Sequence, residues 1–291
     1  FFGGNNSLGQ HDFAPENFLS EGWRFHLPSL GFERVAAYPH KRQTMQTISL
    51  ADAGISIGGF GHSEEAAGES QATSQLEAYR FDAKEESWQR WGGLPRGRTQ
   101  FGLTEHDGKL WIFGGLNYDP AREGDDAFQH VTNVLVADVT GDGKFADAGV
   151  ELPGPRRAFG GAALDGSYYI VGGMRGGFQL VDGCLRFDFA KQTFADMACP
   201  RANRLSAELI ALPGKLYAVG GSLRRDGKMT PERSIEVYDP VADAWRVLLD
   251  DVGFDTKHVH ALAYRDRLLL VRSHTDAGRG RVTLIIPHVR G

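Results

Sequence analysis

The sequence predicts an all-β protein that is built from repeated, four-stranded antiparallel sheets. A Gly-Gly doublet that directly follows an apolar predicted strand occurs five times, at intervals of 55, 56, 58 and 48 residues. No segment has the period of 3.6 residues that is typical of an amphipathic helix. Recurrence at such intervals indicates a repeat architecture. The doublets begin at Gly3, Gly58, Gly114, Gly172 and Gly220.

Each repeat contains four short predicted strands. The first follows a Pro-Arg pair, as in LPRGRTQFGLTEHDG (Leu94–Gly108), and the second ends at the doublet, as in KLWIFGG (Lys109–Gly115). The third and fourth flank a turn that contains aspartate, as in EVYDPVADAW (Glu236–Trp245). Alternating apolar residues around such turns favour β-hairpins.

The doublets, the Tyr238-Asp239-Pro240 turn, and Trp88 and Trp245, each six residues past a turn aspartate, resemble the kelch repeat. This resemblance covers nearly the whole chain and implies a β-propeller with four antiparallel strands in each blade. A degenerate sixth copy, RLLLVRS, runs from Arg267 to Ser273 without the glycines. We therefore expect one domain, residues 1–291, that forms a six-bladed propeller.

The first and last blades are expected to be incomplete. Predicted innermost strands lie near residues 43–50, 99–106, 157–165, 204–212 and 257–265, so the first blade lacks one. Predicted outermost strands lie near residues 32–38, 86–91, 144–150, 192–197 and 243–248, so the last blade lacks one. A preceding segment of about 20–30 residues would supply both strands and close the ring. Alternatively, the region Asn5–Ser20 folds back to do so.

The repeat assigns a packing role to its glycines and tryptophans. The second strand of a blade runs close to the next sheet, where a Cβ atom would collide, and the chain then turns sharply. Tryptophan on the outer strand has a large apolar area and can bridge neighbouring blades. We expect each doublet to mark the closest approach of two sheets.

Composition excludes several classes of function. The net charge of −5 and the pI near 6.1 do not indicate attraction to nucleic acid or anionic lipid. No apolar run is long enough to insert into a membrane. Cys184 and Cys199 are interpreted as buried free thiols rather than a bridge, which weakly favours a reducing compartment. A cytoplasmic location, and a periplasmic or secreted one after removal of a leader, both stay open. We expect no metal and no cofactor.

Arginine dominates the predicted functional face. In a four-stranded propeller, the Pro-Arg entries and the loops after the doublets share one face, and loops on a rigid scaffold carry function. Planar guanidinium groups suit carboxylates and phosphates. The alternative is structural, since such arginines can bond backbone carbonyls between blades. The candidate residues for ligand binding are Arg42, Arg96, Arg98, Arg156, Arg157, Arg201, Arg204 and Arg224, together with His62 and Asn117.

Charged loops offer weaker candidates. Residues 119–130 carry several carboxylates and His130, which could do acid–base work or hold a metal. The alternative is a solvated, charged loop.

The predicted function is recognition, because kelch propellers in general present this face to peptides or partner proteins. Clustered arginines favour an acidic peptide or protein partner. The alternative is a sugar-acid mutarotase or epimerase-like enzyme that acts on a small anionic sugar at the same face, since small bacterial kelch propellers include sialic-acid mutarotases. Asn117, the pair Arg224 and Arg225, and Glu232 could supply its acid–base and arginine groups. The sequence leaves open whether the protein is an enzyme.

Overall fold

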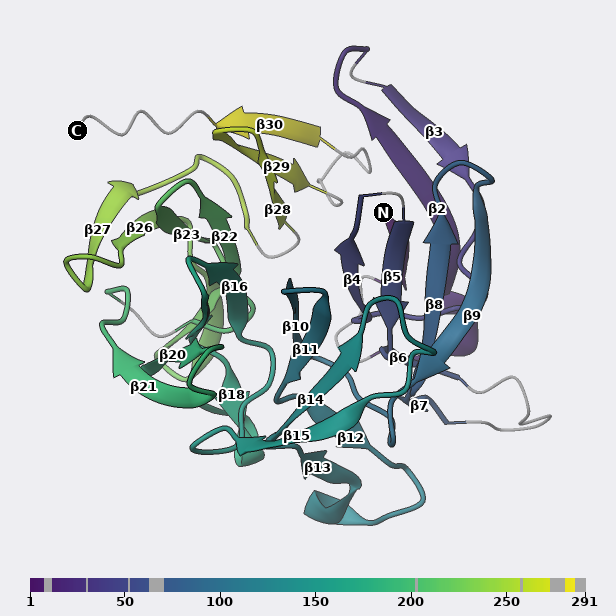
Figure 1. Cartoon of the computed structure of the whole chain (residues 1–291). Coiled ribbons are helices and arrows are strands. Elements are labelled where there is room, and N and C mark those ends of the chain that lie inside the picture. The colour runs from purple at the N-terminus through teal and green to yellow at the C-terminus, as the bar shows by residue number, and fades with distance from the viewer. Residues whose placement is uncertain are drawn as a thin grey trace. The chain divides into compact units, whose positions relative to one another are not determined.

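The chain forms two compact units in the computed structural model (Figure 1). The N-terminal unit is Phe1–Glu151 and the C-terminal unit is Leu152–Gly291. The structure describes residues 1–7, 12–29, 31–51, 53–62, 71–201, 204–256 and 259–272, and the backbone of Arg281–Ile285. That the chain folds as a single domain stays a prediction.

The N-terminal unit contains three antiparallel sheets and two small hairpins. The first sheet is β1 (Phe2–Asn5), β2 (Phe18–His26) and β3 (Gly31–Val35). The second is β4 (Gln46–Ser49), β5 (Ala53–Ile57), β8 (Glu77–Asp82) and β9 (Ser87–Gly93). The third is β10 (Gly102–His106), β11 (Lys109–Phe113), β14 (Asn133–Asp138) and β15 (Ala146–Glu151). The hairpins are β6 (Phe60–Gly61) with β7 (Thr73–Ser74) and β12 (Leu116–Tyr118) with β13 (Phe128–His130), and the 3-10 turns are η1 (Pro15–Asn17) and η2 (Gly124–Ala127).

The C-terminal unit repeats this pattern. Its first sheet is β16 (Gly160–Leu164), β17 (Ser167–Val171), β20 (Cys184–Asp188) and β21 (Thr193–Met197). The second is β22 (Glu208–Leu212), β23 (Lys215–Val219), β26 (Ile235–Asp239) and β27 (Ala244–Leu249). The third is β28 (Val259–Tyr264), β29 (Arg267–Arg272) and β30 (Arg281–Ile285). The hairpins are β18 (Met174–Arg175) with β19 (Gln179–Leu180) and β24 (Ser222–Arg225) with β25 (Lys228–Pro231), and η3 is Gly176–Phe178.

The all-β prediction is confirmed for the described residues, since their helical segments are short 3-10 turns. The predicted innermost and outermost strands lie where the spacing placed them. The expectation that the first and last sheets are incomplete is confirmed over the described residues, since each has three strands and the other four sheets have four. The finer count of six propeller blades is not borne out. That a further segment completes these sheets stays a prediction.

Apolar side chains of the middle strands fill the spaces between neighbouring sheets. Ile55 and Ile57 of β5 pack with Leu110 and Ile112 of β11 in the N-terminal unit. In the C-terminal unit, the innermost strand β22 contacts both β16 and β28. Because the second strand of a sheet is covered on both faces, it is almost continuously apolar, as in Leu110–Phe113.

The doublets at Gly58 and Gly172 contact the backbone that leads into the next sheet. Gly58 and Gly172 both adopt positive φ angles, of 62° and 66°. A Cβ atom added to Gly172 would overlap the carbonyl oxygen of Arg204 in the next sheet. That same carbonyl accepts a hydrogen bond of 3.0 Å from the backbone N–H of Gly173. The doublet is therefore both a turn and a contact between sheets, which excludes side chains.

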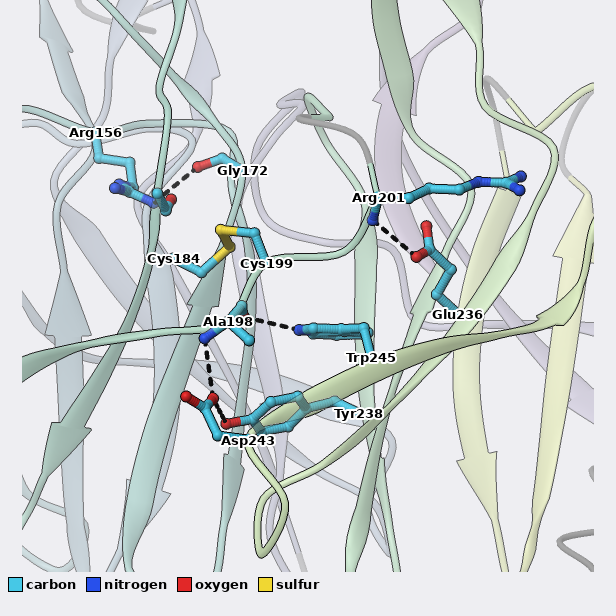
Figure 2. Close-up of a disulfide and its surroundings, with 11 residues drawn as sticks. Arg156, Gly172, Cys184, Ala198, Cys199, Arg201, Glu236, Tyr238, Asp243 and Trp245 are labelled. Atoms are coloured by element: carbon cyan, nitrogen blue, oxygen red, sulfur yellow. Dashed lines mark hydrogen bonds between the residues drawn. A yellow bond between two sulfur atoms is a disulfide. The ribbon is translucent and has the colours of Figure 1, made fainter.

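Both predicted tryptophan bridges are present. Trp245 on β27 donates through Nε1 to the carbonyl of Ala198, at 2.8 Å, in the segment that leaves the preceding sheet (Figure 2). Trp88 on β9 packs edge-on against Phe2 of β1, with ring centroids 4.7 Å apart. Each indole thus joins its outer strand to the neighbouring sheet.

Cys184 and Cys199 form a disulfide, so the prediction of free thiols is wrong (Figure 2). The antiparallel register of β20 and β21 pairs Cys184 with Met197, which leaves Cys199 two residues beyond this pair. The Cα atoms of the two cysteines are 5.4 Å apart, within the range that a disulfide spans. The weak argument for a reducing compartment therefore loses its basis.

Candidate functional site

Four of the predicted arginines are buried clamps within their own sheets. Each donates through Nη1 to the carbonyl of the first glycine of the doublet, sixteen residues further along the chain. The pairs are Arg42–Gly58 at 3.4 Å, Arg98–Gly114 at 3.3 Å, Arg156–Gly172 at 3.1 Å and Arg204–Gly220 at 3.3 Å. These four arginines therefore bond backbone carbonyls, as the structural alternative expected, but they do so within their own sheets rather than between blades.

A second acceptor at the start of the third strand completes each clamp. Arg42 donates to Glu77 at 2.7 Å, Arg98 to the Asn133 side chain at 2.9 Å, and Arg156 to the carbonyl of Gly183 at 3.0 Å. Arg204 bonds the buried carboxylate of Glu236. Burial lowers the pKa of Arg98 to about 10, so its guanidinium stays charged at neutral pH. Protein acceptors already engage these groups, so the geometry does not present them to a ligand.

The remaining predicted residues are dispersed. Arg157 is buried and lies over the ring of Phe178, with 5.4 Å from Cζ to the centroid. Arg96 and Arg224 are exposed. In the N-terminal unit, the His62 ring hydrogen-bonds the carbonyl of Phe13 at 2.9 Å. The side-chain amides of Asn117 and Gln129 lie 3.0 Å apart and hydrogen-bond each other.

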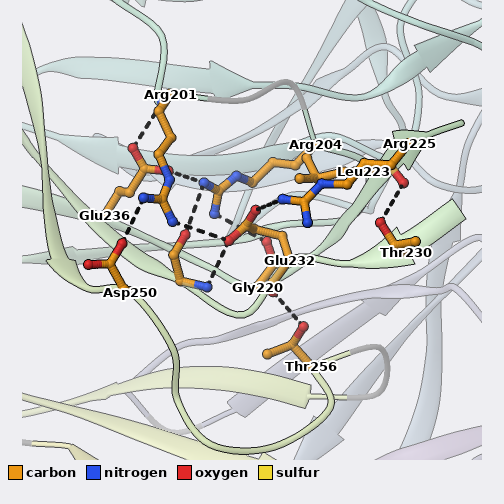
Figure 3. Close-up of polar contacts among 11 residues, drawn as sticks. Arg201, Arg204, Gly220, Leu223, Arg225, Thr230, Glu232, Glu236, Asp250 and Thr256 are labelled. Carbon is orange, nitrogen blue, oxygen red and sulfur yellow. Dashed lines mark hydrogen bonds and ion pairs between the residues drawn. The ribbon is translucent and has the colours of Figure 1, made fainter.

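Arg201 differs from the buried clamps because it belongs to a carboxylate–arginine cluster with Arg225 and Glu232 (Figure 3). The Glu232 carboxylate is 4% exposed, and it lies 3.7 Å from the Arg201 guanidinium and 3.6 Å from that of Arg225. The two arginine side chains are 45% and 63% exposed. A buried anion thus holds two cations that reach the surface.

Glu232 is an exception within the repeat. Its backbone N–H donates to the carbonyl of Gly221, the second glycine of its doublet. Gln75, Val131 and Val181 make the same bond in three other sheets. These four residues are therefore equivalent, and this carboxylate replaces an amide or an apolar side chain.

Local contacts keep Glu232 ionised. Burial by itself would raise the pKa of its carboxyl group. The backbone N–H of Ser234, at 2.9 Å, and the charges of Arg204 and Arg201 outweigh burial, so the pKa lies below its ordinary value. The backbone of Glu232 is also fixed, because Thr256 donates its hydroxyl to the Glu232 carbonyl at 2.6 Å (Figure 3).

Arg201 already binds a carboxylate at the surface. Its Nη1 donates to Asp250 at 2.7 Å, and this hydrogen bond is the main cause that raises the pKa of Arg201. Its backbone N–H donates to Glu236 at 2.9 Å, which anchors the segment on the buried Arg204–Glu236 pair. Asp250 is 79% exposed, whereas Glu236 is buried. Neither acidic residue was predicted from the sequence, although a glutamate within an apolar strand such as IEVYD (Ile235–Asp239) is a signal for a buried ion pair.

The described part of the chain contains no group of three or more His, Cys, Asp or Glu side chains that could hold a metal ion. Among the same residues, no helix is long and apolar enough to span a membrane.

The repeated four-stranded sheets are similar to the blades of kelch-repeat β-propellers. Residues 203–248 match the family described as Kelch motif. The solved structure of YjhT is similar, with a TM-score of 0.73 over 87% of each chain at 14% sequence identity, which is a likeness of fold.

Curated relatives match over shorter stretches. An F-box/kelch-repeat protein of Arabidopsis thaliana is 37% identical over 83 residues, which is 28% of this chain and 17% of that protein. Human Kelch repeat and BTB domain-containing protein 13 is 36% identical over 90 residues, or 31% and 19%. Zebrafish (Danio rerio) Kelch-like protein 15 is 26% identical over 225 residues, or 70% and 34%. The matches thus span about a third or less of these relatives.

Proposed function

We propose that this kelch propeller is a recognition module that binds an acidic segment of a partner protein at Arg201 and Arg225. The observation that carries the proposal is the buried Glu232, which holds both exposed guanidinium groups within 3.7 Å. Recognition is also the role that a kelch propeller suggests, and two relatives combine kelch repeats with an F-box or a BTB domain in their names.

Asp250 supports this proposal, because its carboxylate contacts Arg201 as a partner carboxylate would. It is an exposed residue that hydrogen-bonds Arg201. Exposed ion pairs stabilise proteins by at most about 1 kcal/mol, so a carboxylate from a partner can replace it at little cost. The adjacent hairpin adds the exposed cations Arg224 and Lys228. Positive charge beside a replaceable carboxylate favours an acidic ligand.

The test is fluorescence anisotropy with a fluorescein-labelled peptide rich in glutamate and aspartate. The double variant Arg201→Ala/Arg225→Ala should bind the peptide at least about tenfold more weakly, because charge-assisted hydrogen bonds are lost. Asp250→Asn should strengthen binding, since it removes the internal competitor. Arg246→Ala, which changes an exposed arginine on β27, is the matched control and should bind as the wild type does.

Equal binding by the double variant and the wild type would refute the proposal, as would weaker binding by Asp250→Asn. Arg246→Ala should melt like the wild type, whereas Arg201→Ala/Arg225→Ala removes two cations from the buried Glu232 carboxylate and should melt at a lower temperature. Circular dichroism at the assay temperature would verify that each variant is folded.

No specific observation favours the alternative of a sugar-acid mutarotase or epimerase. Asn117 hydrogen-bonds Gln129, and its own contacts hold Glu232 in the ionised form. Neither the Asn117 amide nor the ionised Glu232 carboxylate is therefore placed to donate a proton to a sugar. Recognition of a protein segment is therefore the single function proposed.

A further inference from the structure

A continuous row of aromatic side chains crosses the N-terminal unit beside its loops. The aromatic row consists of Phe13, Phe60, Tyr118 and Phe128, which come from three successive repeats. Ring centroids are 5.1 Å apart for Phe13 and Phe60, 5.9 Å for Phe60 and Tyr118, and 4.9 Å for Tyr118 and Phe128. The repeat does not explain this row, and sequence analysis did not predict it.

Ring contacts with a buried phenylalanine and hydrogen bonds between two strands hold the aromatic row in place. Phe18 is fully buried and contacts both Phe13 and Phe60. Strand β12, which carries Tyr118, is fastened to β7: the Tyr118 N–H donates to Ser74 at 2.8 Å, and Thr73 donates to the Tyr118 carbonyl at 2.8 Å. Figure 1 shows β6, β7, β12 and β13 grouped at one end of this unit. The rings are therefore pre-arranged, which lowers the entropy cost of binding.

The ends of the row remain exposed to solvent. Phe13 is 39% exposed and Phe128 is 37% exposed. Large exposed aromatic side chains in a rigid cluster are typical of protein interaction sites, where aromatic anchors contribute much of the binding energy.

Carboxylates flank members of the aromatic row along the chain and indicate the charge of its partner. The segments Asp12–Asn17 and Asp119–Phe128 contain six acidic residues and one arginine, Arg122, which is paired with Asp119 at 3.3 Å. Among the described residues, no ion pair engages Glu123, Asp125 or Asp126. The acidic residues are Asp12, Glu16, Asp119, Glu123, Asp125 and Asp126.

We propose that the aromatic row docks a basic segment of a partner protein that carries apolar side chains. Apolar side chains would pack on Phe13 and Phe128, and lysine or arginine would interact with both the ring faces and the surrounding carboxylates. This surface is distinct from the arginines of the carboxylate–arginine cluster, and it has the opposite charge preference.

The experiment uses two fluorescein-labelled peptides and fluorescence anisotropy. The basic peptide alternates lysine and arginine with phenylalanine and leucine, and the acidic peptide replaces every cation with glutamate. The intact protein should bind the basic peptide with an affinity that falls as salt is added. Phe13→Ala/Phe128→Ala should weaken binding at least about tenfold. Asp125→Asn/Asp126→Asn should weaken binding and reduce its dependence on salt.

Two matched controls separate this surface from others. Phe32→Ala removes an exposed phenylalanine of the same unit, on β3, and should leave binding unchanged. Arg201→Ala/Arg225→Ala, the variant that tests the proposed function, should also leave binding of the basic peptide unchanged. Failure of either proposal is thereby distinguishable from failure of the other.

The proposal is overturned if the basic peptide does not bind at up to about 1 mM, or if the acidic peptide binds at least as well. It is also overturned if Phe13→Ala/Phe128→Ala retains full affinity while it melts like the wild type. Sedimentation velocity tests whether a second copy of the chain occupies this surface instead. That occupant would be assigned if the wild type is a dimer and Phe13→Ala/Phe128→Ala is a monomer.

Discussion

The guanidinium Nη1 of Arg204 donates a hydrogen bond to the carbonyl of Gly220, sixteen residues further along the chain, and the same group pairs with the buried Glu236. Arg42, Arg98 and Arg156 make the same bond to their own doublets. The clamp therefore ties together the entry to the first strand, the end of the second and the start of the third.

Removal of the clamp should destabilise the sheets to unequal extents. Arg204→Ala leaves the buried carboxylate of Glu236 without its cation, which should cost about 3–5 kcal/mol. Arg98→Ala leaves only neutral acceptors, the Gly114 carbonyl and Asn133, and should cost about 1–3 kcal/mol. Urea unfolding would measure both values. A larger loss for Arg98→Ala, or no loss for either variant, would contradict a structural role for the clamp.

Glycine substitutions should separate backbone conformation from close packing. Gly172 and Gly214 have nearly equal φ angles, 66° and 70°, but only Gly172 faces the Arg204 carbonyl, while open space surrounds Gly214. Gly214→Ala therefore measures the cost of the left-handed conformation, about 1–2 kcal/mol. Gly172→Ala should cost at least about 2 kcal/mol more because of overpacking. Equal losses of melting temperature would show that the two sheets do not meet there.

Glu232 should make stability depend on pH in the acid range. Its folded-state pKa lies below the ordinary value of 4.5. Its stabilising contribution is therefore fully present above pH 4.5 and is lost as the pH falls through the lower folded-state pKa. Glu232→Gln, which places glutamine where the equivalent Gln75 already stands, should lose less stability than the wild type between pH 7 and pH 3. Parallel curves from urea unfolding at each pH would disprove this linkage.

The disulfide should be detectable in solution and should stabilise the C-terminal unit. Denatured, unreduced protein should have no thiol that reacts with iodoacetamide, whereas reduction should expose both Cys184 and Cys199 to alkylation. Closure of a loop of this size stabilises a fold by about 3 kcal/mol, so Cys184→Ser/Cys199→Ser should melt at a lower temperature. Two reactive thiols in protein that was purified without reductant would contradict the bond.

Most strands were predictable because their pattern is local. Apolar alternation, turn residues and a repeated doublet lie within short windows, so the strands around Gly58, Gly114, Gly172 and Gly220 lie where the spacing placed them. The tryptophan bridges were predictable because Trp88 and Trp245 occupy equivalent positions of the repeat, next to a neighbouring sheet. The three-stranded first and last sheets were predictable as well, because the repeat pattern assigns no innermost strand to the first and no outermost strand to the last.

The candidate site was predictable only in part. Sequence indicated arginine-rich loops but could not separate the buried Arg204 from the half-exposed Arg201, only three residues away. That difference depends on carboxylates at Glu232, Glu236 and Asp250, which strand pairing brings to the same end of one sheet. The disulfide and the aromatic row were missed because each joins residues that are neighbours only in the folded chain.

The sequence by itself determined that this chain forms repeated antiparallel sheets, with a glycine doublet at the turn that ends a second strand, because strand periodicity and the steric demands of a turn act over a few residues. Tertiary structure alone decided which arginines are buried clamps, which reach the surface, and that aromatic rings from three repeats contact one another in a row. Burial and electrostatic pairing depend on distances across sheets, and these distances exist only after the chain has folded.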